Sequence, residues 1–291
     1  MVRLFFQLDM KINKRKASII VIVFILLLFL GSAFLAYGSG SSIGLVSRIK
    51  GVYPAVIVGS KGISVREYEE TIAAAKSLPN FNKKQAYEQM IKHRKTEVFL
   101  ERKNLGLSPE DLAKETKFLT SDKAEYQKLL QSNFHNDSNL FRNSVVYPLT
   151  LEAKAKIYYS SQNSLHNDEY KEANDTLEKV KTDAASFNDL AQQVSDDKFS
   201  AQFGGDLGFF QEGQIIPELE SAILKAELGK VHPNLIVSRY GYHIIYPLTT
   251  SEKDGKKVWQ AKHILIEVKN FDTWLEKQTK DINVIRIVKP D

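Results

Sequence analysis

Two histidines in strand-like segments are the side chains best placed for chemistry. His243 lies in the segment GYHII, where its imidazole faces one side of a strand among apolar side chains, and His263 lies in the segment AKHILI. Residues 249–255 between them form a polar turn of the kind that joins two strands into a hairpin. The sequence therefore predicts that the His263 strand pairs antiparallel with the His243 strand. The alternative for an inward histidine is a hydrogen-bonded core residue without a catalytic role.

Asp196 and Asp197 form an acidic pair shortly after the helix predicted at residues 187–194, and the chain has no cysteine. The absence of cysteine excludes disulfides, thiolate zinc sites and a cysteine nucleophile. A carboxylate can still influence a nearby carbonyl electrostatically without acting as a nucleophile. The alternative is that Asp196 and Asp197 only form a solvated acidic pair where the helix ends.

The remaining motifs argue against several classes of site. Four other histidines lack acidic or histidine partners at metal-ligand spacing, so the sequence predicts no metal site: His93, His135, His166 and His232. The sequence contains no G-x-S-x-G motif, no phosphate-binding glycine loop and no dinucleotide-binding glycine fingerprint. Hydrolase and nucleotide-binding functions are therefore poorly supported.

A glycine pair shapes the segment FGGDLGFF, residues 203–210. Gly204 and Gly205 tolerate positive φ and close backbone approach, so we expect a tight turn that directs Leu207 and Phe210 into a cavity. The alternative is an ordinary loop turn followed by two core residues.

Residues 51–164 are predicted to form a helical domain. A β-branched run and a glycine turn precede Ser64 and Glu67, whose spacing is that of a helix capping box. Helical periodicity then continues to about residue 161, with polar breaks at residues 79–82, 106–109 and 134–138. We therefore expect an all-helical domain that is introduced by one short strand pair.

Residues 165–291 combine helical periodicity with glycine turns and strand patterning, which predicts an α+β domain. Helical segments cover residues 168–182 and 187–194, and a short helix is expected at residues 270–278. Strand patterning follows the glycine turn in GYHIIYPL and KKVWQAKHILIEV, and it returns at residues 282–288. The expected fold class is α+β, with a small antiparallel sheet.

The N-terminal residues predict a membrane anchor. Residues 1–16 carry a net charge of +4, and residues 17–37 contain no charged side chain. As a helix, the uncharged stretch spans roughly 30 Å of hydrocarbon. The positive-inside rule then puts the tail, residues 1–16, in the cytoplasm, and residues 38–50 form a small, polar linker to an extracytoplasmic part. The alternative is a cleaved signal peptide, although the sequence has no A-x-A-like cleavage site.

The segment from Phe187 to Ile245 resembles the parvulin family of peptidyl-prolyl isomerases, in the form found in exported PrsA- and SurA-like foldases. The motifs that carry the resemblance are FNDLAQQVSDD, FGGDLGFFQEGQIIPELESAI, LGKV and RYGYHII. The resemblance implies a carboxylate at Asp197 beside the substrate imide, and a pair of hydrogen-bonded active-site histidines that includes His243. It also implies an apolar pocket for the proline ring, formed by Leu207, Phe210, Ile215 and Leu219. Residues 51–164 resemble the SurA-type chaperone domain.

The second histidine of that family stands elsewhere in this chain. The family's HILV-like first strand precedes its helices, whereas the segment AKAKIYYSSQ upstream of Phe187 has no histidine. The motif occurs instead in AKHILI, after the His243 strand. If residues 258–268 supply the first strand, the domain is circularly permuted, and the rings of His263 and His243 lie within hydrogen-bonding reach, about 3 Å apart or bridged by one water. The alternative is an appended edge strand whose histidine is coincidental.

Together these features predict a membrane-anchored, extracytoplasmic peptidyl-prolyl cis-trans isomerase that assists the folding of exported proteins. Such a reaction needs no cofactor, and the expected partners are unfolded or proline-containing polypeptides. Nucleic acid is not expected, because the chain beyond residue 16 has a net charge of only about +1. The alternative is a holdase chaperone with weak catalysis, since Ile215 and Leu219 stand where the family more often has methionine and phenylalanine. A third possibility is a purely structural envelope anchor.

Overall fold

The computed structural model describes residues 49–76 and 80–290. The predicted cytoplasmic tail, the predicted membrane helix and most of the predicted linker therefore lie outside the described residues. Within the described ranges, no helix combines the length and the apolar character that crossing a membrane requires. The chain divides into two compact units, and the second, Pro54–Ile63 with Glu67–Asp291, contains every contact discussed below.

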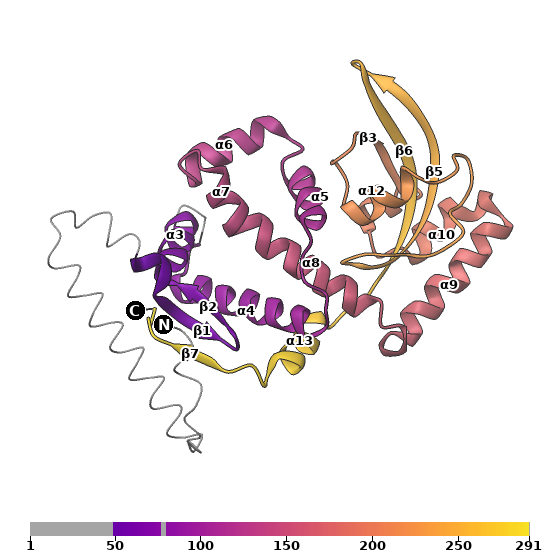
Figure 1. The fold of residues 1–291 in the computed structure, drawn as a ribbon. Coiled ribbons are helices and arrows are strands. Elements are labelled where there is room, and N and C mark those ends of the chain that lie inside the picture. The colour runs from indigo at the N-terminus through magenta and orange to yellow at the C-terminus, as the bar shows by residue number, and fades with distance from the viewer. Residues whose placement is uncertain (1–48, 77–79, 291) are drawn as a thin grey trace, which may run out of the picture. The chain divides into compact units, whose positions relative to one another are not determined.

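The N-terminal region is helical, as its sequence periodicity predicts (Figure 1). Short polar residues set the helix starts: Ser108 and Asp111 form a reciprocal capping box before α5, and Asp122 caps α6. Pro109 occupies the first turn of α5, where its missing N–H has no intrahelical partner to lose. The elements are α3 (Val65–Ala75), α4 (Lys83–Arg102), α5 (Pro109–Leu119), α6 (Lys123–Asn133), α7 (Ser138–Phe141), the π-helix η1 (Arg142–Val146) and α8 (Tyr147–Ser160).

A three-stranded sheet joins the two ends of the described chain. The hairpin of β1 (Pro54–Val58) and β2 (Lys61–Ser64) is extended by β7 (Val284–Arg286), which pairs antiparallel with β1. Helix α13 (Phe271–Thr279), just before β7, contacts α4. The last elements of the expected isomerase domain, residues 165–291, thus contact the helical region. The strand predicted at residues 282–288 completes the edge of β1 in the helical region, where its backbone groups find partners.

The second sheet has the strand order β3-β6-β5-β4, with antiparallel pairing throughout. Strands β5 (Gly241–Lys253) and β6 (Lys256–Glu267) form a long hairpin closed by a turn at Asp254 and Gly255. Strand β6 lies between β5 and β3 (Asp206–Phe210), and short β4 (Ile236–Val237) pairs with the other edge of β5. The last strand of the sequence in this sheet therefore occupies an inner position in space.

Helices cover both faces of this second sheet (Figure 1). Tyr242, Ile244, Ile264 and Ile266 face α9 and α10 in a large hydrophobic cluster. Alternate residues point the other way, where Ile245 packs with α12. Because successive side chains in a strand alternate between faces, His243 and His263 lie on the α12 side. The remaining elements are η2 (Asn163–Leu165), α9 (Asn167–Thr182), η3 (Ala184–Ser186), α10 (Phe187–Val194), α11 (Lys198–Ala201) and α12 (Pro217–Ile223).

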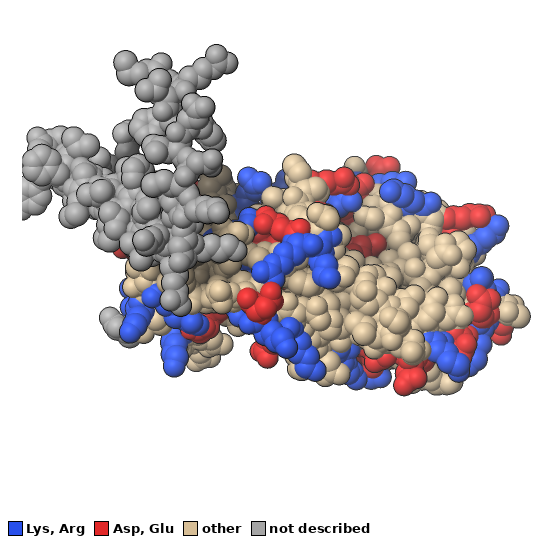
Figure 2. Space-filling view, turned by 60° about the horizontal axis from the view of Figure 1, so that its bottom comes forward, with Lys and Arg blue, Asp and Glu red and all other residues tan. Residues whose placement is uncertain are grey.

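The surface carries mixed charge. On the face seen in Figure 2, Lys and Arg side chains are interspersed with Asp and Glu side chains over the coloured part of the chain. This distribution matches the nearly balanced charge of the sequence beyond residue 16. The coloured part of this face therefore carries no extended positive patch of the kind that attracts a polyanion.

Candidate active site

His243 and His263 form a directly hydrogen-bonded pair. Their strands pair so that Ile245 lies opposite His263 and His243 lies opposite Leu265, which makes the two histidines diagonal neighbours on one face. The Nδ1 atoms are 3.1 Å apart, and the ring planes are tilted by only 20°. The histidines are 1% and 5% exposed, respectively. The pair is therefore shielded from water and held by the register of a single hairpin.

Each histidine has a further partner at Nε2. The Ser238 hydroxyl lies 2.7 Å from Nε2 of His243, and this hydroxyl accepts the backbone N–H of Tyr240 at 3.0 Å. Nε2 of His263 lies 2.7 Å from Oδ2 of Asp197. The hydroxyl of Ser200 donates to the same carboxylate oxygen at 2.7 Å. A continuous hydrogen-bonded chain thus runs from Ser238, directly after β4, across β5 and β6 to the start of α11.

The start of α11 fixes the position of Asp197. Its carboxylate caps this short helix by accepting the backbone N–H groups of Phe199 and Ser200. The hydrogen bond from His263, followed by those from Ser200, holds the pKa of Asp197 well below its ordinary value, although burial alone would raise it. The carboxylate is therefore ionised at neutral pH.

Asp196 has a different task from Asp197. Its backbone N–H donates to the carbonyl of Leu265 at 2.7 Å, and its carboxylate accepts the backbone N–H of Glu267 at 2.9 Å. Asp196 thus ties the segment after α10 to the end of β6. This role is structural and differs from that of a solvated helix terminus.

Burial keeps His243 neutral. Removal from water lowers the pKa of His243 well below the ordinary value of 6.5, and the neighbouring His263 lowers it further. A neutral imidazole has one N–H and one acceptor nitrogen, so the two partners of His243 cannot both be donors or both be acceptors. The proton arrangement of the whole chain is therefore coupled through this ring.

An apolar cavity of about 410 Å³ adjoins the hydrogen-bonded chain. Leu207, Ile215 and Leu219 line it, together with Asp197 and both histidines. The full lining is Phe118, Asp197, Leu207, Gln214, Ile215, Ile216, Leu219, Tyr240, His243, His263 and Leu265. This volume falls in the range of ordinary small-ligand sites.

Phe210 differs from the sequence expectation, because it is absent from the lining. Its ring is 4% exposed and packs in a hydrophobic cluster with Trp259, Leu219 and Ile223. Strand alternation and a register shift between Asp206 and Phe209 decide which side chains of β3 face the cavity. Phe210 therefore supports the pocket from the core.

The glycine pair positions β6 as well as turning the chain. Gly205 has φ of +81°, and its carbonyl accepts the backbone N–H of His263 at 2.8 Å. A Cβ at this position would overlap the carbonyl oxygen of His263. The close approach of the two backbones therefore requires glycine and holds the His263 backbone against this turn.

Several residues at this site were missed by sequence reasoning. Ser200 follows Asp197 at helix-cap spacing, and that spacing could have indicated their contact. Ser238 directly follows the short strand β4 and carries no sequence signal for its bond to His243. Phe118 comes from α5, and only the tertiary fold brings it to the cavity.

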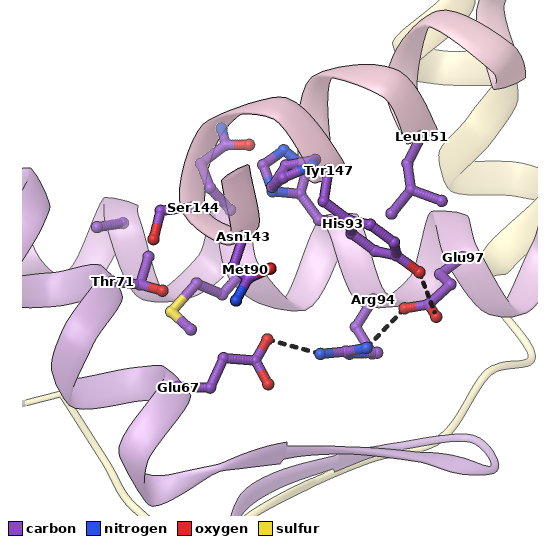
Figure 3. Close-up of a pocket in the computed structure, with 13 residues that line it drawn as sticks. Glu67, Thr71, Met90, His93, Arg94, Glu97, Asn143, Ser144, Tyr147 and Leu151 are labelled. Carbon is purple, nitrogen blue, oxygen red and sulfur yellow. Dashed lines mark hydrogen bonds and ion pairs between the residues drawn. The ribbon is translucent and has the colours of Figure 1, made fainter. Parts of the chain in front are cut away.

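A second cavity, of about 200 Å³, lies in the helical region (Figure 3). Arg94 bridges the carboxylates of Glu67 and Glu97, with both N–O distances 2.6 Å, and the Tyr147 hydroxyl donates to Glu97 at 2.9 Å. Burial raises the pKa of Tyr147 to about 12. These side chains satisfy one another's hydrogen bonds, which indicates a structural network.

Among the described residues no cluster suited to hold a metal ion is present.

Comparison with known proteins links the chain to foldases. Residues 150–248 match the family described as the PPIC-type PPIASE domain. The chain is 31% identical over 175 residues to "Foldase protein PrsA 2" of Bacillus anthracis, which covers 55% of this chain and 60% of that protein. It is 33% identical over 132 residues to the protein of the same name from Bacillus cereus, covering 42% and 46%.

A further curated relative and a crystal structure are also similar to the chain. The chain is 30% identical over 135 residues to the "Probable parvulin-type peptidyl-prolyl cis-trans isomerase" of Bordetella bronchiseptica, covering 44% of this chain and 52% of that protein. The chain thus spans about half the length of the curated relatives it matches. The crystal structure of peptidylprolyl isomerase (PrsA) from Bacillus anthracis is similar with 21% identity and a TM-score of 0.21, covering 66% of this chain and 86% of that one.

Proposed function

We propose that the chain belongs, through residues 150–248, to the parvulin-type peptidyl-prolyl isomerase family and that it catalyses cis-trans isomerisation of X-Pro bonds in unfolded polypeptides. The observation that carries the proposal is the His243–His263 pair, hydrogen-bonded to Asp197 beside an apolar cavity. We assign the proline ring to the cavity wall of Leu207, Ile215 and Leu219, which are apolar and large enough to enclose it.

The proton arrangement of the site follows from its hydrogen bonds. When both histidines are neutral, Ser238 donates to Nε2 of His243, whose Nδ1–H donates to Nδ1 of His263, whose Nε2–H donates to Asp197. In this arrangement each ring nitrogen of the pair has a partner, and the ionised Asp197 accepts the N–H of His263.

This geometry suits a reaction that makes no covalent intermediate. Rotation about an X-Pro bond meets a barrier of roughly 20 kcal/mol and takes tens of seconds or longer without catalysis. Catalysis requires that the twisted amide bind more tightly than either planar isomer. The cavity excludes water from the imide, and the His263–Asp197 dyad provides a fixed electrostatic environment beside it. None of these tasks requires a nucleophile or a cofactor.

The domain is, in our proposal, circularly permuted, with residues 258–268 supplying the family's first strand. Support comes from the inner position of β6 between β3 and β5, and from the end of the family match at residue 248, before β6 begins. We further propose that residues 17–37 anchor the protein in a membrane with its catalytic part outside the cytoplasm. In that position it would assist the folding of exported proteins.

The first experiment measures cis-trans exchange in a proline tetrapeptide with the full chain. We expect acceleration, a loss of roughly tenfold or more in Asp197→Asn, and a higher KM in Ile215→Ala, whose half-buried side chain can be shortened with little effect on folding. Lys198→Ala is the matched control, because it neighbours Asp197 and is exposed. No acceleration by the wild-type chain, together with suppressed aggregation of an unfolded client, would instead favour a holdase.

The permutation is tested by cutting the chain at the exposed hairpin turn, Asp254–Gly255. Residues 1–254 alone should be inactive, and adding back residues 255–291 should restore turnover. The same fragment with His263→Ala should restore the far-ultraviolet circular dichroism but not the turnover. Full activity of residues 1–254 without the fragment would show that β6 is dispensable.

A further inference from the structure

Helix α5 of the helical region reaches the cavity of the isomerase domain. Phe118, near its C-terminal end, lines the cavity, whereas every other described lining residue lies between Asp197 and Leu265. The Phe118 ring is partly buried and meets a wall that also includes Ile216 and Tyr240. Helix α5 also contacts α12, which carries Leu219 (Figure 1). The cavity is thus assembled from two distant parts of the sequence.

A buried ion pair holds α5 in this position. The guanidinium of Arg239 donates to both carboxylate oxygens of Glu115 at 2.7 and 2.8 Å, and its Nε lies 3.2 Å from the carboxylate of Glu218 on α12. The Glu115 side chain is 3% exposed and that of Arg239 is 12% exposed. Separating a pair buried to this degree would leave charges without compensation. The contact between α5 and the isomerase domain is therefore specific in geometry as well as in charge.

A glycine in the turn before α12 permits the close approach of α5. Gly213 has φ of +92°, and a Cβ there would lie 3.0 Å from Cγ of Lys117 and 3.1 Å from its carbonyl oxygen. The Lys117 ammonium pairs with Glu212 at 2.6 Å. The same turn continues into Gln214 and Ile215, which line the cavity. Helix α5 therefore packs directly on the turn that shapes the pocket.

The ion pair is also adjacent to the hydrogen-bonded chain of the active site. Arg239 lies between Ser238, whose hydroxyl is bonded to His243, and Tyr240, whose ring lines the cavity. Fixing the guanidinium to α5 restrains the backbone on both sides. The contact of α5 with Arg239 thus helps to position Tyr240 in the cavity wall and, through Ser238, the ring of His243.

The wall that α5 completes is uncharged. Away from Asp197 and the histidines, the lining consists of aliphatic and aromatic side chains and one amide. The charged side chains of α5 nearest to it, Glu115 and Lys117, are already in ion pairs with the isomerase domain. An acidic substrate residue would find no cationic partner on this wall, and an apolar one would find Phe118 and Tyr240.

We propose that Phe118 is a specificity-determining residue of the isomerase site, which contacts the substrate residue next to proline and favours an apolar side chain there. The Glu115–Arg239 ion pair holds it in place. This inference rests on the proposed isomerase function and names its substrate class. It makes the helical region a part of the binding site.

The test compares two peptides, Ala-Phe-Pro-Phe and Ala-Glu-Pro-Phe, with the full chain. Phe118→Ala should lower kcat/KM for the Phe-Pro peptide by about tenfold, mainly through KM, and leave the Glu-Pro peptide unchanged. Glu115→Gln keeps the size of the side chain and removes its charge. This variant should also lower kcat/KM for the Phe-Pro peptide. Leu119→Ala is the matched control, because Leu119 packs in a cluster of the helical region away from the cavity.

The outcomes separate this inference from the proposed function. Equal effects of Phe118→Ala on both peptides, or the same selective loss in Leu119→Ala, would overturn the assignment of Phe118 while isomerase activity stands. If the wild-type chain accelerates neither peptide, the proposed function fails, and calorimetric binding of the two peptides becomes the readout. Tighter binding of the Phe-Pro peptide that is lost in Phe118→Ala would then still support the inference, and equal binding would overturn it.

Discussion

Replacing Gly205 by alanine should displace His263 while leaving most of the fold in place. Gly205 has φ of +81°, and its carbonyl accepts the backbone N–H of His263. The added Cβ would overlap the His263 carbonyl oxygen and come within 3.3 Å of Cβ of Ala191. Because a carbon needs about 3.3 Å from a carbonyl oxygen, β6 must move away by roughly an ångström.

Two contributions set the loss of folding stability in Gly205→Ala. A left-handed backbone at a residue with a Cβ costs about 1–2 kcal/mol, and forcing an extra methyl group into a packed site costs about 1–3 kcal/mol more. A displacement of about 1 Å at a reacting group can reduce turnover by roughly a hundredfold. The hydrogen bond of 3.1 Å between Nδ1 of His243 and Nδ1 of His263 has little room to lengthen. Activity should therefore fall much further than stability.

Gly208 provides the matched control. Its φ of +68° imposes the same backbone strain, but a Cβ there would meet no atom within 4 Å. Both variants should lose about 1–2 kcal/mol in urea unfolding, and only Gly205→Ala should lose the additional stability and most of its proline-peptide turnover. Equal turnover in the two variants would refute the argument that contact with Gly205 positions His263.

Three further outcomes follow from the same geometry. Stability should decrease as the pH falls below about 6.5, because His243 binds a proton when unfolded but stays neutral in the fold, where its pKa is lowered. Urea midpoints at pH 7.5 and 5.5 test this, and the trend should persist in His93→Gln, which removes a half-buried histidine whose pKa is also lowered. Phe210→Ala should cost about 3–5 kcal/mol in urea unfolding, because its ring is 4% exposed beside Trp259; a loss below about 1 kcal/mol would contradict that packing. Ser238→Ala should reduce proline-peptide turnover with the circular dichroism spectrum unchanged, and full turnover would remove Ser238 from the site.

Local signals in the sequence determined the elements of the fold. Polar caps and prolines place helix starts such as Ser108–Pro109, and helical periodicity marks the segments between the breaks. The alternation in GYHII and AKHILI, joined by a polar turn, predicted the hairpin that brings His243 and His263 together. These features depend on residues within a few positions of one another, so a single sequence contains them in full.

The tertiary structure decided which distant groups meet. Three features depend on sheet register and on contacts across the chain: the bond between the Ser238 hydroxyl and His243, the burial of Phe210 in the core cluster, and the pairing of β7 with β1. Phe118 lies more than a hundred positions from Tyr240 in the sequence, yet both line one cavity. A hydroxyl or an aromatic ring has the same local pattern whether it faces a catalytic histidine, a core or solvent. Only packing, through the exclusion of water and the demand that buried polar groups find partners, selects among these environments.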